Sequence, residues 1–141
     1  MGVAIPARAI EAMSKSPDAR KAIFDWMGKD LEGVHLPNDY VLLGTYIRPE
    51  KTAGGIYRPQ TNVDEDVWQG KVGLLLKLGP DAFKDTDDYT FNFGPGGEPK
   101  VGDWVVFKVG DAMSLNVKDF PCRYIRDIGI KMKVNDPAII F

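Results

Sequence analysis

Apolar positions recur at two different spacings along the chain, and the change of spacing divides it in two. Before residue 38 they return every three or four residues, as on one face of a helix. From residue 39 onward, short apolar runs alternate with clusters of Gly, Pro, Asp and Asn, a pattern that is typical of the strands and turns of an all-β domain. The pattern therefore predicts a helical extension over residues 1–37 and a β domain over residues 38–141.

The extension is expected to hold two short helices. The first covers residues 6–13, and the second follows Ser16, whose hydroxyl is expected to cap it. Pro17 and Asp18 then occupy the first turn, and Gly28 ends the helix. The apolar stripe of the second helix consists of Ala19, Ile23, Trp26 and Met27. This stripe must pack on the chain's own body or on a neighbouring subunit, and the sequence leaves both alternatives open.

The β domain has three strong strand candidates and several weaker ones. The strong candidates are residues 40–47, 68–78 and 104–109. The first of them is apolar on both faces, which favours a strand of a barrel. The weaker candidates are residues 114–117, 121–125, 128–134 and 138–141. Because closure removes the exposed edges of so many short strands, the expected fold is a mainly β, partly open barrel with a short N-terminal α-helical extension.

Two long segments interrupt the strands. Residues 50–67 are rich in Gly, Pro, Asn and acidic residues, with Ile56 and Tyr57 as apolar anchors at their centre. Residues 81–99 form the second long loop, and its aspartates alternate with aromatic residues. Loops of this length in a compact domain are usually functional or disordered. Exposed apolar residues in a Gly-rich loop suit a docking role, so Ile56 and Tyr57 are candidate partner contacts.

Length and charge exclude several classes of partner. The 141 residues fit one domain, and the formal net charge of -2 has both signs interspersed. Such a surface offers no basic patch for nucleic acid or an anionic membrane. No apolar run approaches the ~20 residues that cross a bilayer, and the N-terminus lacks a signal-peptide pattern. Cys122 is the only cysteine, which excludes an intrachain disulfide and suits a reducing cytoplasm.

Candidate chemistry is sparse. His35 is the only histidine, and nothing nearby marks a catalytic or metal partner for it. The aspartates of the second loop, Asp85, Asp87 and Asp88, do not follow an EF-hand spacing. The glycines at 94–97 lack the Lys-Ser/Thr of a phosphate loop. We therefore expect no catalytic residue, no metal and no cofactor.

Four landmarks resemble the GroES family of co-chaperonins in order and spacing, over residues 39–141. They are the opening strand DYVLL at 39–43, TAGGI at 52–56, QGKV at 69–72 with Leu78-Gly79, and KVGDWVVF at 100–107. The resemblance implies a partly open β-barrel, a homo-oligomeric ring of seven subunits, and a mobile loop over residues 50–67 that docks on a chaperonin. By this resemblance the docking residues are Gly54, Gly55, Ile56, Tyr57 and Arg58. The implied subunit interface consists of Val41, Leu43, Ala138, Ile139, Ile140 and Phe141, the last four in a C-terminal strand.

The chain also departs from the family. The family's docking tripeptide is aliphatic, whereas Arg58 stands here at its third position, and a buried arginine without a partner is costly. The family lacks residues 1–37, and the loop here ends in an acidic group, 64–66, followed by Trp68. Trp68 and Trp26 are therefore further candidate partner anchors. This departing pattern resembles proteins encoded by tailed bacteriophages.

Two functions agree with these features, and both act by binding alone rather than by catalysis. In the first, the protein is a virion component that decorates a viral shell and clamps neighbouring capsid subunits. In the second, it is a phage-encoded co-chaperonin that caps a host chaperonin ring while capsid protein folds. The extension, which could form an arm, Arg58 and the acidic group favour the first, and the TAGGI landmark favours the second. Together these features favour the virion component, with the co-chaperonin as the alternative. The expected location is the virion or the host cytoplasm.

Overall fold

The computed structural model of the chain describes residues 18–48 and 71–140. Within them the protein is mainly β, with one antiparallel sheet of six strands and one short N-terminal α-helix. The helices and strands are α2 (Ala19–Met27), η1 (Gly28–Gly33), β1 (Tyr40–Thr45), β2 (Val72–Leu78), β3 (Trp104–Phe107), η2 (Val109–Asp111), β4 (Met113–Val117), β5 (Phe120–Arg126), η3 (Asp127–Gly129), β6 (Ile130–Val134) and η4 (Pro137–Ile139).

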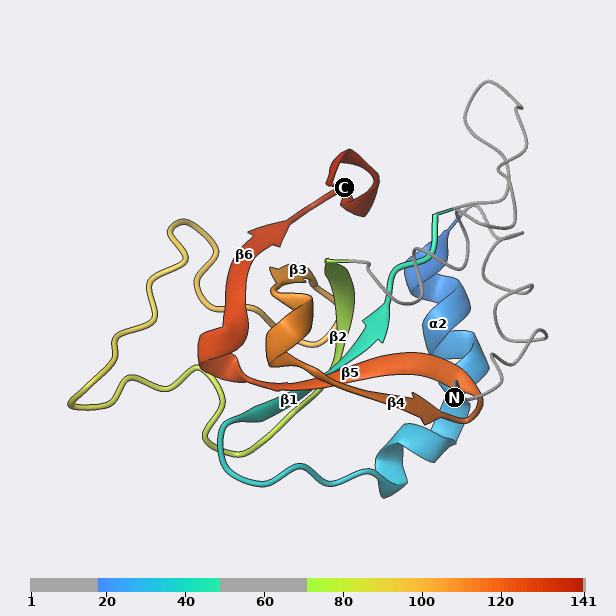
Figure 1. Cartoon of the computed structure of the whole chain (residues 1–141), viewed down its shortest axis with the longest axis horizontal. Coiled ribbons are helices and arrows are strands. Elements are labelled where there is room, and N and C mark those ends of the chain that lie inside the picture. The colour runs from blue at the N-terminus through green and yellow to red at the C-terminus, as the bar shows by residue number, and fades with distance from the viewer. Residues whose placement is uncertain (1–17, 49–70, 141) are drawn as a thin grey trace.

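The sheet has the strand order β4-β5-β1-β2-β3-β6, so β1 and β2 lie at its centre (Figure 1). β1 pairs with β5 on one side and with β2 on the other. Both edges of β1 are therefore occupied within the chain. Over residues 18–48 and 71–140 no pairing joins β4 to β6, so these two are the edge strands. Closure into a GroES-like barrel stays a prediction.

Both faces of the central strands are buried. Leu42 of β1 and Leu74 of β2 belong to a helix-side cluster, whereas their neighbours Leu43 and Leu75 belong to a loop-side cluster. The helix-side cluster consists of Ile23, Met27, Leu31, Leu42, Tyr46, Ile47, Val72, Leu74, Leu76, Trp104, Phe120 and Cys122. The loop-side cluster consists of Val41, Leu43, Leu75, Phe83, Val105, Phe107, Ile125 and Ile130.

Helix α2 packs on the chain's own sheet. The predicted apolar stripe faces it, with Ile23 and Met27 fully buried and Trp26 partly buried against the helix-side cluster. Gly28 ends the helix as expected, with φ of 56° and its N–H bonded to the Phe24 carbonyl. The predicted start is corrected: Asp18, not Ser16, is the N-cap, because its carboxylate accepts the Lys21 N–H at 3.1 Å. Ser16 and the predicted helix at residues 6–13 lie outside the described residues.

The turn before β3 forms as its sequence predicts. The Lys100 N–H donates to the Asp103 carboxylate at 2.9 Å, and the Asp103 N–H donates back to the Lys100 carbonyl at 2.9 Å. Gly102 has φ of 97°, a conformation that favours glycine. The turn is fastened to β2 through the Gly102 N–H, which donates to the Leu75 carbonyl at 2.8 Å. This local chemistry fixes where β3 begins.

The packing of α2 predicts that Ile23→Ala destabilises the isolated chain. Removing a fully buried isoleucine side chain from a packed core costs about 2–5 kcal/mol of unfolding free energy. Urea unfolding of the full chain measures this loss. Arg20→Ala is the matched control, because Arg20 is exposed on the same helix and should change stability by less than about 0.5 kcal/mol. Equal stability of the two variants would show that α2 does not belong to the core.

Candidate functional site

The segment that holds the predicted docking residues connects two adjacent strands. β1 and β2 are antiparallel neighbours, and Thr45 pairs with Gly73 at the end from which residues 49–70 depart. Just beyond, the Tyr46 N–H donates to the Val72 carbonyl at 3.0 Å. The described residues on the two sides of this segment therefore lie next to each other on the sheet. The docking candidates of this segment lie outside the described residues: Gly54, Gly55, Ile56, Tyr57, Arg58 and Trp68.

Trp26, predicted as a partner anchor, contacts the chain itself. Its indole N–H donates to the Lys118 carbonyl at 2.7 Å, and its ring packs against the helix-side cluster. The Lys118 ammonium forms an ion pair with Asp30 at 2.9 Å. Trp26 is thus a clamp between α2 and the turn that joins β4 to β5. This contact could not be predicted from the sequence, because its acceptor is a backbone carbonyl 92 residues away, which no side chain marks.

The turn held by Trp26 has a strained backbone. Lys118 and Asp119 have φ of 49° and 65°, a left-handed conformation that costs roughly 1–2 kcal/mol for each residue other than glycine. Two central residues with positive φ match the twist of a hairpin, and Val117 pairs with Phe120 across this turn. The contacts from Trp26 and Asp30 offset part of this strain.

Val41 and Leu43, predicted at a subunit interface, are buried inside the chain. Neither side chain has any exposed surface, and both belong to the loop-side cluster. Because β1 is also paired on both edges, it has no free backbone edge for a second subunit. The prediction for these two residues is corrected: they are core residues of the chain.

The predicted C-terminal strand over residues 138–141 is also corrected. Residues Pro137–Ile139 form the 3₁₀ helix η4, because the Asp136 carboxylate caps the Ala138 N–H at 2.9 Å and Pro137 occupies the first turn. Ala138 and Ile139 are exposed, the latter by 73%, while Ile140 packs against the helix-side cluster. Phe141 lies outside the described residues.

The two edge strands differ in the side chains that they expose. β4 exposes Met113 and Leu115 and contains no charged residue. β6 exposes Met132 between Lys131 and Lys133, and lysines on an edge strand discourage pairing with other chains. The unprotected apolar edge of the sheet is therefore β4.

The long loop over residues 81–99 folds partly back onto the sheet, and Figure 1 shows it in yellow, projecting at one end. Phe83 is buried in the loop-side cluster, and Phe91 and Phe93 pack edge-on against its ring at centroid distances of 5.6 and 5.9 Å. Tyr89 contacts Phe91 but stays exposed. The Asp85 carboxylate accepts the Phe91 N–H at 2.8 Å, which serves the loop's own backbone. The aromatic residues thus cover the sheet.

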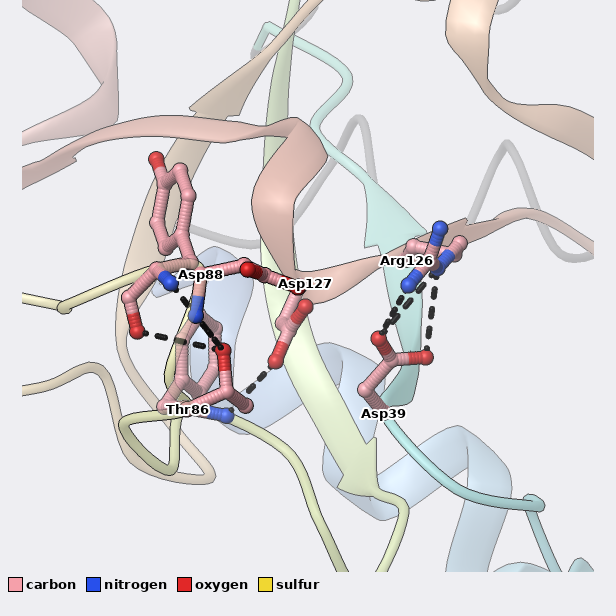
Figure 2. Close-up of polar contacts among 7 residues, drawn as sticks. Asp39, Thr86, Asp88, Arg126 and Asp127 are labelled. Atoms are coloured by element: carbon pink, nitrogen blue, oxygen red, sulfur yellow. Dashed lines mark hydrogen bonds and ion pairs between the residues drawn. The ribbon is translucent and has the colours of Figure 1, made fainter.

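A polar junction fixes the root of this loop to the body (Figure 2). The buried Asp127 carboxylate accepts the Phe83 N–H at 2.9 Å through Oδ2. Phe83 has φ of 59°, so its backbone is strained at this point of attachment. On the far side, the Asp39 carboxylate receives the Arg126 guanidinium, with the shortest contact at 2.8 Å. The Asp127 N–H donates to the Asp39 carbonyl at 2.9 Å and joins the two halves.

The two carboxyl groups of the junction are shifted in opposite directions. The Arg126 guanidinium beside Asp39 lowers the pKa of that carboxyl below its ordinary value. Burial raises the pKa of Asp127, and the negative charge of Asp39 adds to the rise. This junction could not be predicted from the sequence, because Asp39, Arg126 and Asp127 form no motif and meet only in the fold.

The buried thiol of Cys122 is not activated for chemistry. Burial raises its pKa to about 12, so almost no thiolate forms near neutral pH. His35 is exposed in the connection before β1. Over residues 18–48 and 71–140, no three His, Cys, Asp or Glu side chains gather as a metal site would need.

The sequence matches no protein-family model and none of the curated proteins with which it was compared. Within the described part of the chain, no helix is long and apolar enough to cross a membrane.

The burial of Cys122 predicts slow thiol labelling in the folded chain. A pKa of about 12 against an ordinary 9.0 lowers the thiolate fraction on the order of 10³-fold, and burial blocks the reagent as well. Labelling with a chromogenic disulfide at constant pH, with and without denaturant, measures the ratio of rates. Labelling of the folded chain at the rate of the unfolded chain would contradict this placement of β5.

Proposed function

We propose that the chain is a non-enzymatic docking subunit of the co-chaperonin type, with a GroES-like, partly open barrel that assembles into a homo-oligomer and caps a chaperonin. The observation that carries the proposal is the placement of β1 and β2. These neighbouring strands anchor both ends of the segment with the TAGGI landmark on the centre of a rigid sheet. The KVGD part of the fourth landmark, residues 100–103, forms a hydrogen-bonded turn directly before β3, and this supports the proposal.

The packing of α2 changes the balance between the two candidate functions. The sequence favoured a clamp on a viral shell partly because residues 1–37 could form an arm. Ile23 and Met27 of α2 are instead fully buried in the subunit's own core. Of the extension, only residues 1–17 are left for such an arm, and this supports the co-chaperonin over the shell component.

A shell component stays the second candidate because of one observation, the uncharged edge of β4. Met113 is exposed by 63%, and Leu115 beside it is also exposed, so this strand offers an apolar edge for lateral attachment. Capsid subunits are the partners in this case, and the location is the virion rather than the host cytoplasm.

Capture on an ATP-loaded host chaperonin ring tests the first candidate. Ile56→Ser should weaken capture by roughly 30-fold, the effect of losing about 2 kcal/mol at a docking hot spot. Ile128→Ser is the matched control, because Ile128 is exposed by 39% in η3, outside both the docking segment and the implied subunit interface, and should bind as the parent does. If the parent chain is not captured, or if both variants bind alike, the docking assignment is wrong.

Mass spectrometry of purified virions tests the second candidate. A shell component should be present in stoichiometric amount, and a chain that lacks residues 1–17 but keeps α2 should occupy fewer sites. Deletion must stop before Asp18, because that residue caps α2 and α2 belongs to the core. Absence of the chain from the particle would exclude this role.

A further inference from the structure

The polar junction contains a carboxyl oxygen without a hydrogen bond. Asp127 is only 2% exposed, and its Oδ2 accepts the Phe83 N–H. Its Oδ1 is buried and has no partner among the residues that the structure describes. A buried carboxylate with one oxygen unpaired is costly, because that oxygen has lost its water without a replacement.

The charged surroundings of Asp127 are asymmetric. Asp39, from the segment before β1, accepts the Asp127 N–H through its carbonyl at 2.9 Å and places a negative charge near the Asp127 carboxyl group, while Arg126 at the end of β5 donates to the Asp39 carboxylate at 2.8 Å. The backbone N–H groups of Phe83 and Ile128 complete the groups that act on this carboxyl. The Asp39 carboxylate is therefore paired with the Arg126 guanidinium. The Asp127 carboxylate instead has uncharged N–H donors and the negative charge of Asp39 beside it.

Protonation of Asp127 removes both unfavourable features, the unpaired oxygen and the repulsion from the Asp39 carboxylate. The protonated Oδ1 becomes a donor, and the Asp39 carboxylate is the acceptor that faces it, while Oδ2 stays available to the Phe83 N–H. We propose that Asp127 and Asp39 share one proton, and that this proton completes a chain of hydrogen bonds from Phe83 through Asp127 and Asp39 to Arg126. The proton thereby fastens the root of the loop over residues 81–99 to the start of β1.

The pKa shifts agree with this arrangement and give its direction. Burial and the Asp39 charge raise the pKa of Asp127 above its unfolded value, so its proton stabilises the folded chain, increasingly as pH falls through the folded pKa. The pKa of Asp39 is lowered, chiefly by the hydrogen bond and the positive charge of Arg126. The stability from Asp39 is instead lost as pH falls through its own, lower pKa. At a pH between the pKa of Asp39 and the pKa of Asp127, the pair of carboxyl groups holds one proton.

Loss of the proton at higher pH should loosen the loop root. Two adjacent carboxylates then repel, and Asp127 gains hydration by moving outward, away from the Phe83 N–H. Phe83 is the buried aromatic residue on which Phe91 and Phe93 pack, so its attachment affects the whole loop. This control of the loop is independent of the proposed docking function.

Nuclear magnetic resonance on the full chain tests the shared proton. With labelled aspartate carboxyl carbons, Asp127 should titrate above the range of an unfolded aspartate, about 3.9. The Phe83 amide proton should shift through the same midpoint. In Asp127→Asn, whose amide can donate and accept like the protonated acid, the Phe83 amide should lose this pH dependence. Asp87→Asn is the control, because Asp87 is exposed on the same loop.

Asp39→Asn tests the pair separately, because it removes the like charge while Asp127 stays in place. The midpoint of Asp127 should then fall. A midpoint of Asp127 at or below about 3.9 in the parent chain would overturn the proposal. So would an unchanged midpoint in Asp39→Asn, or a Phe83 amide that titrates equally in Asp127→Asn and in the parent.

Discussion

The burial of both faces of β1 and β2 is the constraint on which the rest of the structure depends. Apolar strands at the centre of a sheet cannot leave either face in water, so the chain must supply a cover for each. α2 covers one face, and the aromatic residues of the loop over 81–99 contribute to the other. Neither cover is stable alone: α2 has nine residues, fewer than an isolated helix needs, and the loop has no regular structure. The sheet supplies the surface on which α2 and the loop over residues 81–99 are ordered. These two elements in turn exclude water from the faces of the sheet.

Backbone strain marks the places where these covers are attached. Phe83 has positive φ where the loop is bonded to Asp127, and Lys118 and Asp119 have positive φ where Trp26 clamps α2. Such conformations persist only when the surroundings over-determine them. At both attachments a hydrogen bond from or to the backbone of a strained residue makes the contact, and at Lys118 an ion pair with Asp30 adds to it. The covers are thus positioned by polar contacts and stabilised by apolar ones.

Local sequence signals predict much of the fold, but they do not predict the contacts of the candidate site. Strands were predicted where apolar runs end at turns with their own chemistry, as at residues 100–103, and α2 ends at Gly28 as expected. The C-terminal prediction was wrong because an apolar run was read as a strand, although Asp136-Pro137 is also a helix-start signal. Trp26 and Asp127 could not be placed, because their partners are a carbonyl and a backbone N–H distant in sequence. Backbone groups leave no mark in the sequence, so contacts with them appear only in the fold.

The candidate docking segment and the proton-linked junction lie at opposite ends of β1. Asp39 precedes the strand and contacts Arg126, whereas Tyr46 follows it at the point from which residues 49–70 depart. A strand of six residues separates the two by about 20 Å, and its interior is fully packed on both faces. A strand that is close-packed on both faces does not bend easily. A change of charge at Asp127 is therefore not transmitted along β1 to its other end. The charge state of Asp127 should therefore act on the loop over residues 81–99 and leave the docking end of the sheet unchanged.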